Sequence, residues 1–353
     1  EAEYTAAKNA LGEFVRKGWL QYDEKEAYYI YRQKMKDNDQ YGLVCLSSVD
    51  DYMNDQIKKH EHTRPAKEID RINHMYTIGA HPGPVFLAHH HMSELVAIKK
   101  LWCTSHKPDF SFISDDDVLH EGWTIDDDQT MDAITALFTN NVSQTYIADG
   151  HHRSAASAKV GLRMRQENGD SKESYDSFLS VLFDEEELDI WDYNRVIKDL
   201  NGYNATEFLH AIAEHFDIAP LDKEYKPQEK YSYGMLLSNQ WYRLDLKETH
   251  EVGQGIASLD IQVLSNLVLN PILGIKDQRT DPRIDFVGGI RGMDGLSKRV
   301  KSGQWELAFS IHPVSMKELF DVADSGQVMP PKSTWFEPKL RSGLYINHFN
   351  RTS

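Results

Sequence analysis

The stretch TYIADGHHRSAASA, residues 145–158, decides the fold, because it joins a strand signal to a helix signal through one sharp turn. The apolar residues 146–148 are typical of the end of a buried strand, and Asp149-Gly150 predicts the turn. From Ser154 onward, the alanines predict a helix that packs closely against a sheet. A strand followed directly by such a helix indicates an α/β or α+β protein, with helices on mixed sheets.

The same turn has the composition of a phosphate site. A helix N-terminus favours an anion through its dipole and its unpaired N–H groups, and Arg153 adds a forked cation. Asp149 then remains as an acceptor for Mg²⁺ or for a hydroxyl proton. The alternative is a plain structural turn, because Asp-Gly is a common turn dipeptide. Four consecutive polar or titratable groups at a strand-to-helix junction serve no core purpose, which favours function.

Length and composition limit the class of protein. The chain has 353 residues, 40% of them hydrophobic and 11% aromatic, which is enough for one large or two ordinary domains. We place a soft boundary near residue 200 and expect domains at 1–200 and 201–353. No run approaches the ~20 apolar residues of a membrane span, so we expect no membrane partner. The formal net charge of −16 disfavours nucleic-acid binding, because phosphate backbones attract basic surfaces.

The cysteines and the acidic runs add two smaller expectations. Cys45 and Cys103 lie in apolar or aromatic surroundings, which suits reduced, buried thiols and a cytoplasmic protein. The acidic runs at 115–117, 126–128 and 184–187 are interpreted as solvated loops or helix starts, without a metal.

Hydrophobic periodicity predicts the order of elements along the chain. Predicted helices cover residues 4–17, 51–78 with a second helix opened by Pro65, 130–139, 154–169, 205–216 and 258–274. Predicted strands cover residues 28–34, 41–48, 82–91 and 145–149, with a strand and an acidic turn at 175–190 and a hairpin at 231–246. Residues 94–101 are predicted as a strand or short helix, and 284–313 as strand, glycine loop, helix and strand.

A second cluster, IKKHEHTRPAKEIDR at residues 57–71, combines carboxylates with several cations. It does not fit a helical zinc site, because its histidines are two residues apart and would face opposite sides of a helix. One interpretation is a solvated charged helix. In the functional interpretation, Glu61 is a base or metal-side carboxylate, and Lys59 and Arg64 beside it hold anionic groups.

Two segments of the second half are weaker candidates. FVGGIRGMDGLSKR at residues 286–299 matches neither standard nucleotide fingerprint; its loop could bring Arg291 to a ligand or be an ordinary tight connection. MPPKSTWFEPKLRSGL at residues 329–344 begins with a rigid Pro-Pro pair. It offers one cation and two hydroxyls, from Lys332, Ser333 and Thr334. Trp335 and Phe336 could stack on a purine or, equally well, pack on the core.

Four strings together, YIADGHHR, DDYMNDQIKKHEHTRPAKEIDR, DFVGGIRG and MPPKSTWFEPKLRSGL, resemble the bacterial and archaeal family known as domain of unknown function 1015. The resemblance runs over essentially the whole chain. Members of that family usually start earlier, with a segment that includes a Pro-Pro-Tyr-Asp turn. We therefore expect a segment ahead of Glu1.

The DGHHR box is in turn similar to that of the ParB/sulfiredoxin-like superfamily, in which a strand, a turn and a helix hold nucleotide phosphates. A free-serine kinase of that superfamily has a similar Asp-Gly-His box and uses a catalytic Glu. The resemblance implies a nucleotide-binding core of that kind, a C-terminal α+β portion packed on it, and nucleotide-dependent phosphoryl transfer. Sulfiredoxin chemistry needs a cysteine in the box, where this chain has His151 and His152.

The sequence thus predicts a phosphotransferase, a kinase that acts on a small hydroxyl metabolite, with free serine as one candidate, ATP or ADP as donor, and Mg²⁺. The predicted catalytic residues are Glu61, Asp149, which is also the predicted metal ligand, and His152. The predicted phosphate or nucleotide ligands are Gly150, His151, Arg153, Ser154, Lys59, Arg64, Arg291, Lys332, Ser333 and Thr334.

Two other classes stay open at this point. One is a ParB-like nucleotide-binding regulatory module that turns over no small molecule. The other is a metal-dependent phosphatase or hydrolase that uses the many histidines, although the run His89 to His91 does not favour a metal, because adjacent residues on a strand alternate faces. A homodimer is also left open.

Overall fold

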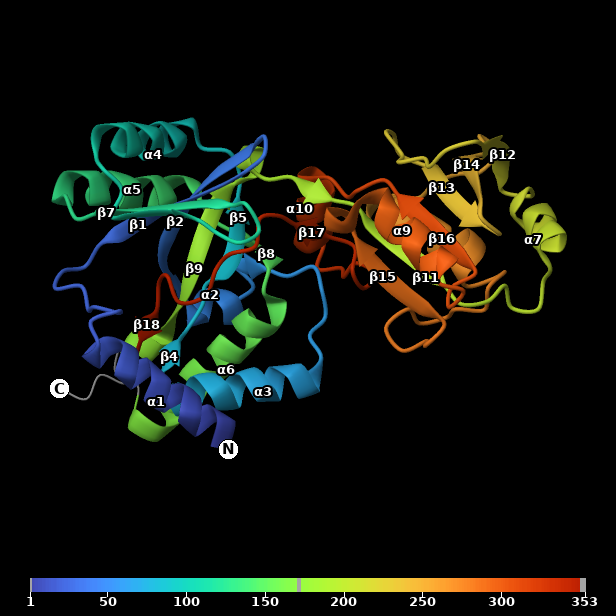
Figure 1. Cartoon of the computed structure of the whole chain (residues 1–353). Coiled ribbons are helices and arrows are strands. Elements are labelled where there is room, and N and C mark those ends of the chain that lie inside the picture. The colour runs from blue at the N-terminus through green and yellow to red at the C-terminus, as the bar shows by residue number, and fades with distance from the viewer. Residues whose placement is uncertain (1, 170–172, 350–353) are drawn as a thin grey trace. The chain divides into compact units, whose positions relative to one another are not determined.

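The chain divides into two compact units (Figure 1). The structure, a computed structural model, describes residues 2–169 and 173–349. Unit 1 comprises the described residues up to 188 and those from 338 onward, and unit 2 comprises Asp189–Glu337. The division follows Leu188, earlier than the boundary predicted near residue 200, and the last segment belongs to the first unit. Both units combine helices with sheets, which confirms the predicted mixed α/β class.

Unit 1 is built on one large sheet. Its helices are α1 (Ala2–Arg16), α2 (Val49–Met53), α3 (Pro65–Ile78), α4 (Ser93–Ser105), α5 (Asp128–Asn141) and α6 (His151–Asn168). Its main strands are β1 (Tyr28–Met35), β2 (Asn38–Ser48), β3 (Ile57–Lys58), β5 (Val85–His89), β6 (Phe110–Ile113), β7 (Leu119–Ile125), β8 (Thr145–Asp149) and β9 (Ser177–Asp184). The short strands β4 (Ala80–His81) and β18 (Asn347–His348) pair with each other.

The sheet of unit 1 has eight strands in the order β3-β8-β5-β9-β2-β1-β7-β6. The pairs β3/β8 and β5/β9 are parallel, and the other neighbours are antiparallel. Strand β8 lies between β3 and β5, and its residues 146–148 are buried; Ile147 packs in a core cluster with Ala158 of α6. The strand is paired on both sides only at its start, where β3 meets Thr145 and Tyr146, whereas β5 alone follows it to Asp149 before the turn.

Helix α6 packs closely against the sheet and against α3, as its small residues predict. Ala155, Ala156, Ser157 and Ala158 are all buried. Ala158 belongs to a core cluster with β5, β8 and β9, whereas Ala156 faces a second cluster that contains Met75 of α3. The helix begins at His151, three residues before the predicted start, and ends before Gly169 as predicted.

The predicted helical stretch 51–78 is wrong in its first half. Only α2, which begins before this stretch, and α3 are helical, and residues 57–58 form β3, which pairs in parallel with the start of β8. Pro65 is the first residue of α3, as predicted, with Arg64 at the N-cap. The zinc argument from helical faces therefore has no basis in the structure, because residues 59–64 are not helical.

The acidic run at 184–187 is a helix start, one of the two predicted alternatives, because Asp184 caps a 3-10 helix at Glu185–Glu187. Asp184 is fully buried and accepts hydrogen bonds from the Met92 backbone N–H at 2.9 Å and from the His91 ring at 3.0 Å. Glu187 forms an ion pair of 2.8 Å with the buried Lys99. The run therefore holds the start of α4 and the loop before it.

Unit 2 contains one six-stranded antiparallel sheet in the order β12-β14-β13-β16-β11-β15. The strands are β11 (Tyr193–Ile197), β12 (Phe216–Leu221), β13 (Ser232–Leu237), β14 (Gln240–Leu246), β15 (Ile284–Gly288) and β16 (Leu307–Ile311). The helices are α7 (Ala205–Ile212), α8 (Asp260–Leu264), which continues as a π turn (Ser265–Leu269), α9 (Gly292–Lys301) and α10 (Met316–Asp324). The short strands β10 (Ile190–Trp191) and β17 (Trp335–Phe336) pair separately.

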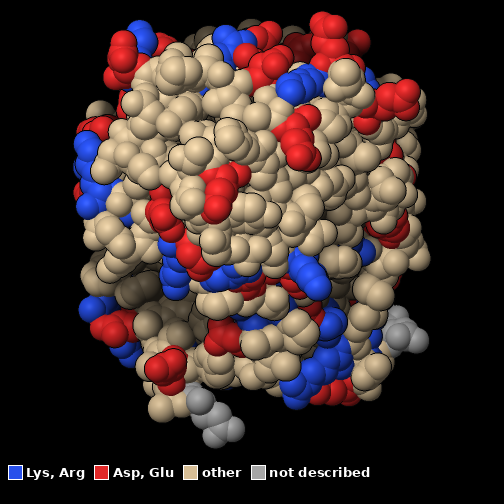
Figure 2. All heavy atoms as spheres, turned by 90° about the vertical axis from the view of Figure 1, so that its right-hand side faces the viewer, with Lys and Arg blue, Asp and Glu red and all other residues tan. Residues whose placement is uncertain are grey.

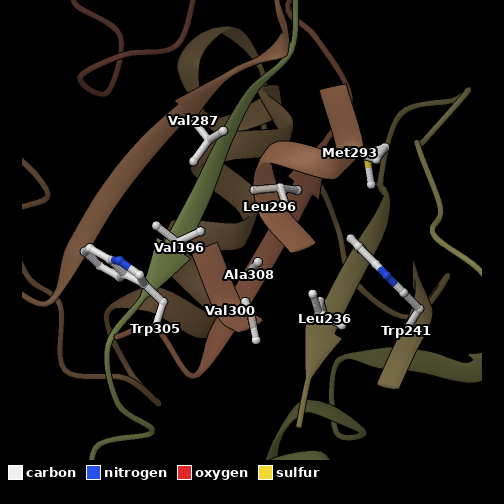
Figure 3. Close-up of a cluster of buried hydrophobic side chains, with 9 residues drawn as sticks. All are labelled: Val196, Leu236, Trp241, Val287, Met293, Leu296, Val300, Trp305 and Ala308. Atoms are coloured by element: carbon white, nitrogen blue, oxygen red, sulfur yellow. The ribbon is translucent and has the colours of Figure 1, made fainter. Parts of the chain in front are cut away.

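Helix α9 supplies one side of a core cluster in unit 2 (Figure 3). Met293, Leu296 and Val300 recur at helical spacing and are buried. They pack with strand residues of β11, β13, β14, β15 and β16 and with Trp305. The predicted order of strand, glycine loop, helix and strand over 284–313 is confirmed.

The surface charge is mixed on the face shown in Figure 2. Acidic and basic side chains lie beside each other there among uncharged ones, so the acidic excess does not form a single-sign patch on that face. Within the described residues, no helix is both long and apolar enough to cross a membrane.

Candidate functional site

The turn between β8 and α6 is the centre of the candidate site. Gly150 is the N-cap of α6 with φ of 95°, a left-handed conformation that a residue with a Cβ adopts only at a cost. Glycine offers no side chain to cap the helix. The first N–H groups of a helix have no intrahelical partner, and the helix dipole places partial positive charge there. The turn thus presents donors that suit an anion.

The N-terminus of α3 meets the N-terminus of α6. The backbone N–H of Arg64, the N-cap of α3, donates to Nε2 of His152 at 2.9 Å. Four residues earlier, the His60 ring contacts the His151 ring edge-on, with 4.5 Å between ring centroids. Residues 60–64 are therefore held against the first turn of α6 at both ends. Two helix N-termini side by side add their dipole fields at one place.

His151 and His60 are buried neutral groups. Burial lowers the pKa of His60 to about 4, although Asp149 opposes the shift. Burial also places the pKa of His151 well below its ordinary value, and the neighbouring His60 adds to this. The His151 side chain is 6% exposed. A phosphate contact from residue 151 would therefore come from its backbone N–H and not from a charged ring.

Two predicted ligands have side chains already engaged in local structure. Ser154 is buried, and its hydroxyl donates to the Gly150 carbonyl at 3.1 Å. The Arg153 guanidinium donates through Nη1 to the Pro84 carbonyl, and burial lowers its pKa. The predicted bidentate binding of a phosphate by Arg153 would have to use its other nitrogens, because Nη1 already binds the loop before β5.

Asp149 has a partner that the sequence analysis missed. Its Oδ2 lies 3.2 Å from Nζ of Lys339, and the two side chains are 51% and 43% exposed. Lys339 is in the C-terminal segment that returns to unit 1. Lys339 lies in the segment 329–344, which the sequence singles out as a weaker candidate. Nothing in the composition of that segment indicates a contact with Asp149, which is far away along the chain.

Glu61 and Arg64 lie in the segment that the two histidine contacts hold. Glu61 is half-buried and Arg64 is exposed. Because the His60 ring contacts the His151 ring, the segment that carries Glu61 lies against the first turn of α6. Lys59 turns elsewhere: its Nζ lies 4.1 Å from the centre of the Tyr52 ring and donates to the Tyr52 carbonyl at 3.3 Å.

The remaining candidates lie in unit 2. Arg291 is exposed in the turn that follows β15. The buried Arg195 donates to the carbonyls of Pro331 and Lys332, at 2.9 Å each. Ser333 is buried, and its hydroxyl donates to the Pro330 carbonyl at 2.7 Å. Arg195 therefore fixes the segment that carries Lys332, Ser333 and Thr334.

The aromatics of that segment pack in unit 2. Phe336 is 1% exposed. The Trp335 ring meets Tyr193 edge-on at 5.1 Å and covers Gly288, where an added Cβ would lie 2.7 Å from the indole. This favours the packing interpretation over a purine stack. It also brings the glycine loop and the Pro-Pro segment, far apart in the sequence, next to each other within unit 2.

A cavity in unit 1 lies at the opposite end of β8, away from the turn. It has a volume of about 1250 Å³ and includes Thr145, at the start of β8, among its lining residues, but none of the residues 149–154. Within the described parts of the chain, no group of three or more His, Cys, Asp or Glu side chains is arranged to hold a metal ion. A Mg²⁺ ion that keeps several waters and takes one carboxylate plus phosphates would still fit at the exposed Asp149.

The fold and the site define a two-unit mixed α/β protein in which a left-handed glycine joins β8 to α6. The chain belongs to the family described as protein of unknown function DUF1015, whose model matches residues 1–262. This confirms the family resemblance over residues 1–262. Its extent over the rest of the chain and the ParB-like nature of the DGHHR box stay predictions. A search of curated proteins found no match.

Several solved structures are distantly similar. A free serine kinase in complex with AMP is 13% identical, with a TM-score of 0.42, over 92% of this chain and 95% of its own. SbnI with a C-terminal truncation from Staphylococcus aureus is 13% identical, with a TM-score of 0.42, over 86% and 87%. A conserved hypothetical protein from Pyrococcus furiosus is 13% identical, with a TM-score of 0.39, over 85% and 94%.

Proposed function

We propose that this chain is a nucleotide-dependent phosphotransferase that acts on a small hydroxyl metabolite, with ATP or ADP as donor, Mg²⁺, and free serine as the first acceptor to test. The observation that carries the proposal is the meeting of the α3 and α6 N-termini through the bond from the Arg64 N–H to His152. Each joining segment also carries a carboxylate, Asp149 on one and Glu61 on the other.

Phosphoryl transfer needs positioning and charge neutralisation more than covalent chemistry by the protein. In the proposed site, backbone N–H groups of residues 151–153 bind the phosphate oxygens of the nucleotide. The exposed Arg64 adds positive charge beside them. Mg²⁺, when bound at Asp149, neutralises charge on the phosphates. Glu61 accepts the proton of the attacking hydroxyl.

His152 has a positioning role in this scheme. Its Nε2 accepts the hydrogen bond from Arg64, so the neutral ring carries its proton on Nδ1. The bond ties the segment of Glu61 to the helix that holds the phosphates. Loss of this bond would leave the segment held only by the contact between the His60 and His151 rings.

The test is transfer of labelled phosphate from ATP or ADP to serine and similar alcohols by the purified protein with Mg²⁺. We expect Asp149→Asn and Glu61→Gln to abolish transfer, because each removes a carboxylate that touches metal or substrate. Glu13→Gln, an exposed carboxylate of α1 paired with Lys17, is the matched control and should keep full turnover.

The outcomes separate the classes of function. Full turnover in both site variants would end the assignment of the catalytic residues. Nucleotide binding without any transfer would favour a regulatory module instead. A melting temperature that rises with nucleotide and Mg²⁺ would support binding to the folded chain by mass action.

A further inference from the structure

A lysine from the C-terminal segment lies at the phosphate turn. Nζ of Lys339 is 3.2 Å from Oδ2 of Asp149, the residue directly before the N-cap of α6. The ammonium group therefore lies beside the first turn of α6. Of the residues that the sequence analysis assigned to the turn, none is a lysine, so this ion pair adds a flexible cation to the site.

We propose that Lys339 is a phosphate-binding residue, and this rests on the proposed function. Lys339 is paired with Asp149 in the chain without ligand and binds phosphate once nucleotide and metal are bound. In the chain without ligand, Lys339 neutralises the carboxylate. When a divalent cation takes the carboxylate, the two cations compete for one partner, and the ammonium turns to the phosphate oxygens beside it. A lysine suits this exchange because its charge sits on a flexible four-carbon stem.

The backbone of Lys339 is held independently of its side chain. Its carbonyl accepts a hydrogen bond of 2.9 Å from Nε2 of the buried Gln33. The neighbouring Arg341 pairs with Asp116 at 3.1 Å, and the N–H of Gly343 donates to the Pro82 carbonyl at 2.8 Å. The segment therefore keeps its place when the lysine side chain changes partner.

Stability does not explain the pair. Exposed ion pairs contribute little to folding, because solvent screens them and the side chains lose freedom. Both members of this pair are about half exposed. The position of the lysine beside a helix N-terminus is accounted for by anion binding, where a second cation adds to the dipole.

The experiment compares nucleotide affinities of the full chain and of Lys339→Met, by calorimetry with and without Mg²⁺. The probes are adenosine, AMP, ADP, ATP and inorganic tripolyphosphate. Because the variant cannot form the charge-assisted hydrogen bond to phosphate, it should bind ATP and tripolyphosphate about 10-fold or more weakly. Adenosine, which has no phosphate, should change by less than about 2-fold.

Two further variants make the result specific. Lys17→Met removes another exposed lysine of unit 1 that is paired with a carboxylate, Glu13, and should leave every affinity unchanged. Lys339→Arg keeps the charge and should retain most of the affinity for ATP. A loss that is equal for adenosine and ATP, with a lower melting temperature, would indicate a structural role and overturn the proposal.

The failure of this inference is distinguishable from failure of the proposed function. If the wild-type chain binds ATP and Lys339→Met binds it equally well, only the role of Lys339 is wrong. If the wild-type chain binds neither nucleotide nor tripolyphosphate, both proposals are wrong.

Discussion

Buried histidines couple the stability of unit 1 to pH. Burial lowers the pKa of His81 to about 3 and that of His89 to about 4. His81 packs against Phe349, with 4.9 Å between ring centroids, and Nδ1 lies 3.1 Å from the Asn347 amide. In the unfolded chain such a ring takes up a proton near pH 6.5. Acid therefore favours the unfolded state.

For His81 the sign of the effect follows from the lowered pKa. The stability that depends on the neutral ring is fully present above pH 6.5 and is lost as the pH falls from 6.5 towards 3. At pH 5 the loss from one such residue is about 2 kcal/mol relative to neutral pH. His81→Asn should remove that part of the pH dependence, as measured by urea unfolding at pH 7.5 and pH 5.

The control for His81 is His62→Gln, because the His62 side chain is exposed. This variant should leave the difference in unfolding free energy between the two pH values unchanged. An undiminished pH dependence in His81→Asn would contradict the assignment of a buried neutral ring at this position.

For single residues, the sequence predicts the roles that depend on local backbone conformation. Gly150 as the turn residue and Pro65 as the first residue of α3 follow from backbone preferences of glycine and proline. The contact of Arg153 with Pro84, or of Lys339 with Asp149, depends on which loops the fold brings together. No pattern of spacing contains that information.

The junction between β8 and α6 depends on the left-handed conformation of Gly150, so a side chain at this position should destabilise the junction. A Cβ at Gly150 would meet its nearest atoms at 3.9 Å, so space is available and the cost is conformational. Gly150→Ala should lower the free energy of unfolding by about 1–2 kcal/mol. Denaturant unfolding of the two proteins measures this difference.

Gly12→Ala is the matched control for this prediction. Gly12 lies inside α1, and an added Cβ there meets nothing within 4 Å. Alanine is the better helix former by about 1 kcal/mol in a helix interior, so this change should stabilise the chain or leave it unchanged. Effects of the same sign in both variants would contradict the assigned conformation of Gly150.

Elements with strong local signals were predicted, and elements that depend on distant partners were not. The hairpin at 231–246 and helix α9 follow from alternation and from helical spacing. Residues 57–58 lie in a charged stretch that favours a helix, yet they form β3, because the start of β8 supplies a parallel partner. Tertiary pairing overrides local preference in so short a segment.

At the scale of the whole molecule, unit 1 is discontinuous in sequence and unit 2 is not. Residues from 338 onward return to unit 1, where Phe349 is buried with Met75 and Met164, and Tyr345 contacts Tyr31. From the sequence alone, this segment is predicted to belong to the C-terminal region, because it is continuous with that region along the chain. A return of this kind is decided by which core the last aromatic residues fit.

Each unit therefore has its own core, and core variants should act within one unit. Leu296 is fully buried in unit 2, and Leu296→Ala should cost about 2–5 kcal/mol there. Phe349→Ala should cost about 3–5 kcal/mol in unit 1.

Hydrogen exchange followed by mass spectrometry measures each unit separately. We expect Leu296→Ala to accelerate exchange mainly within Asp189–Glu337, and Phe349→Ala mainly in unit 1. Equal acceleration in both units by either variant would show that they unfold together, and that the division by core does not describe their stability.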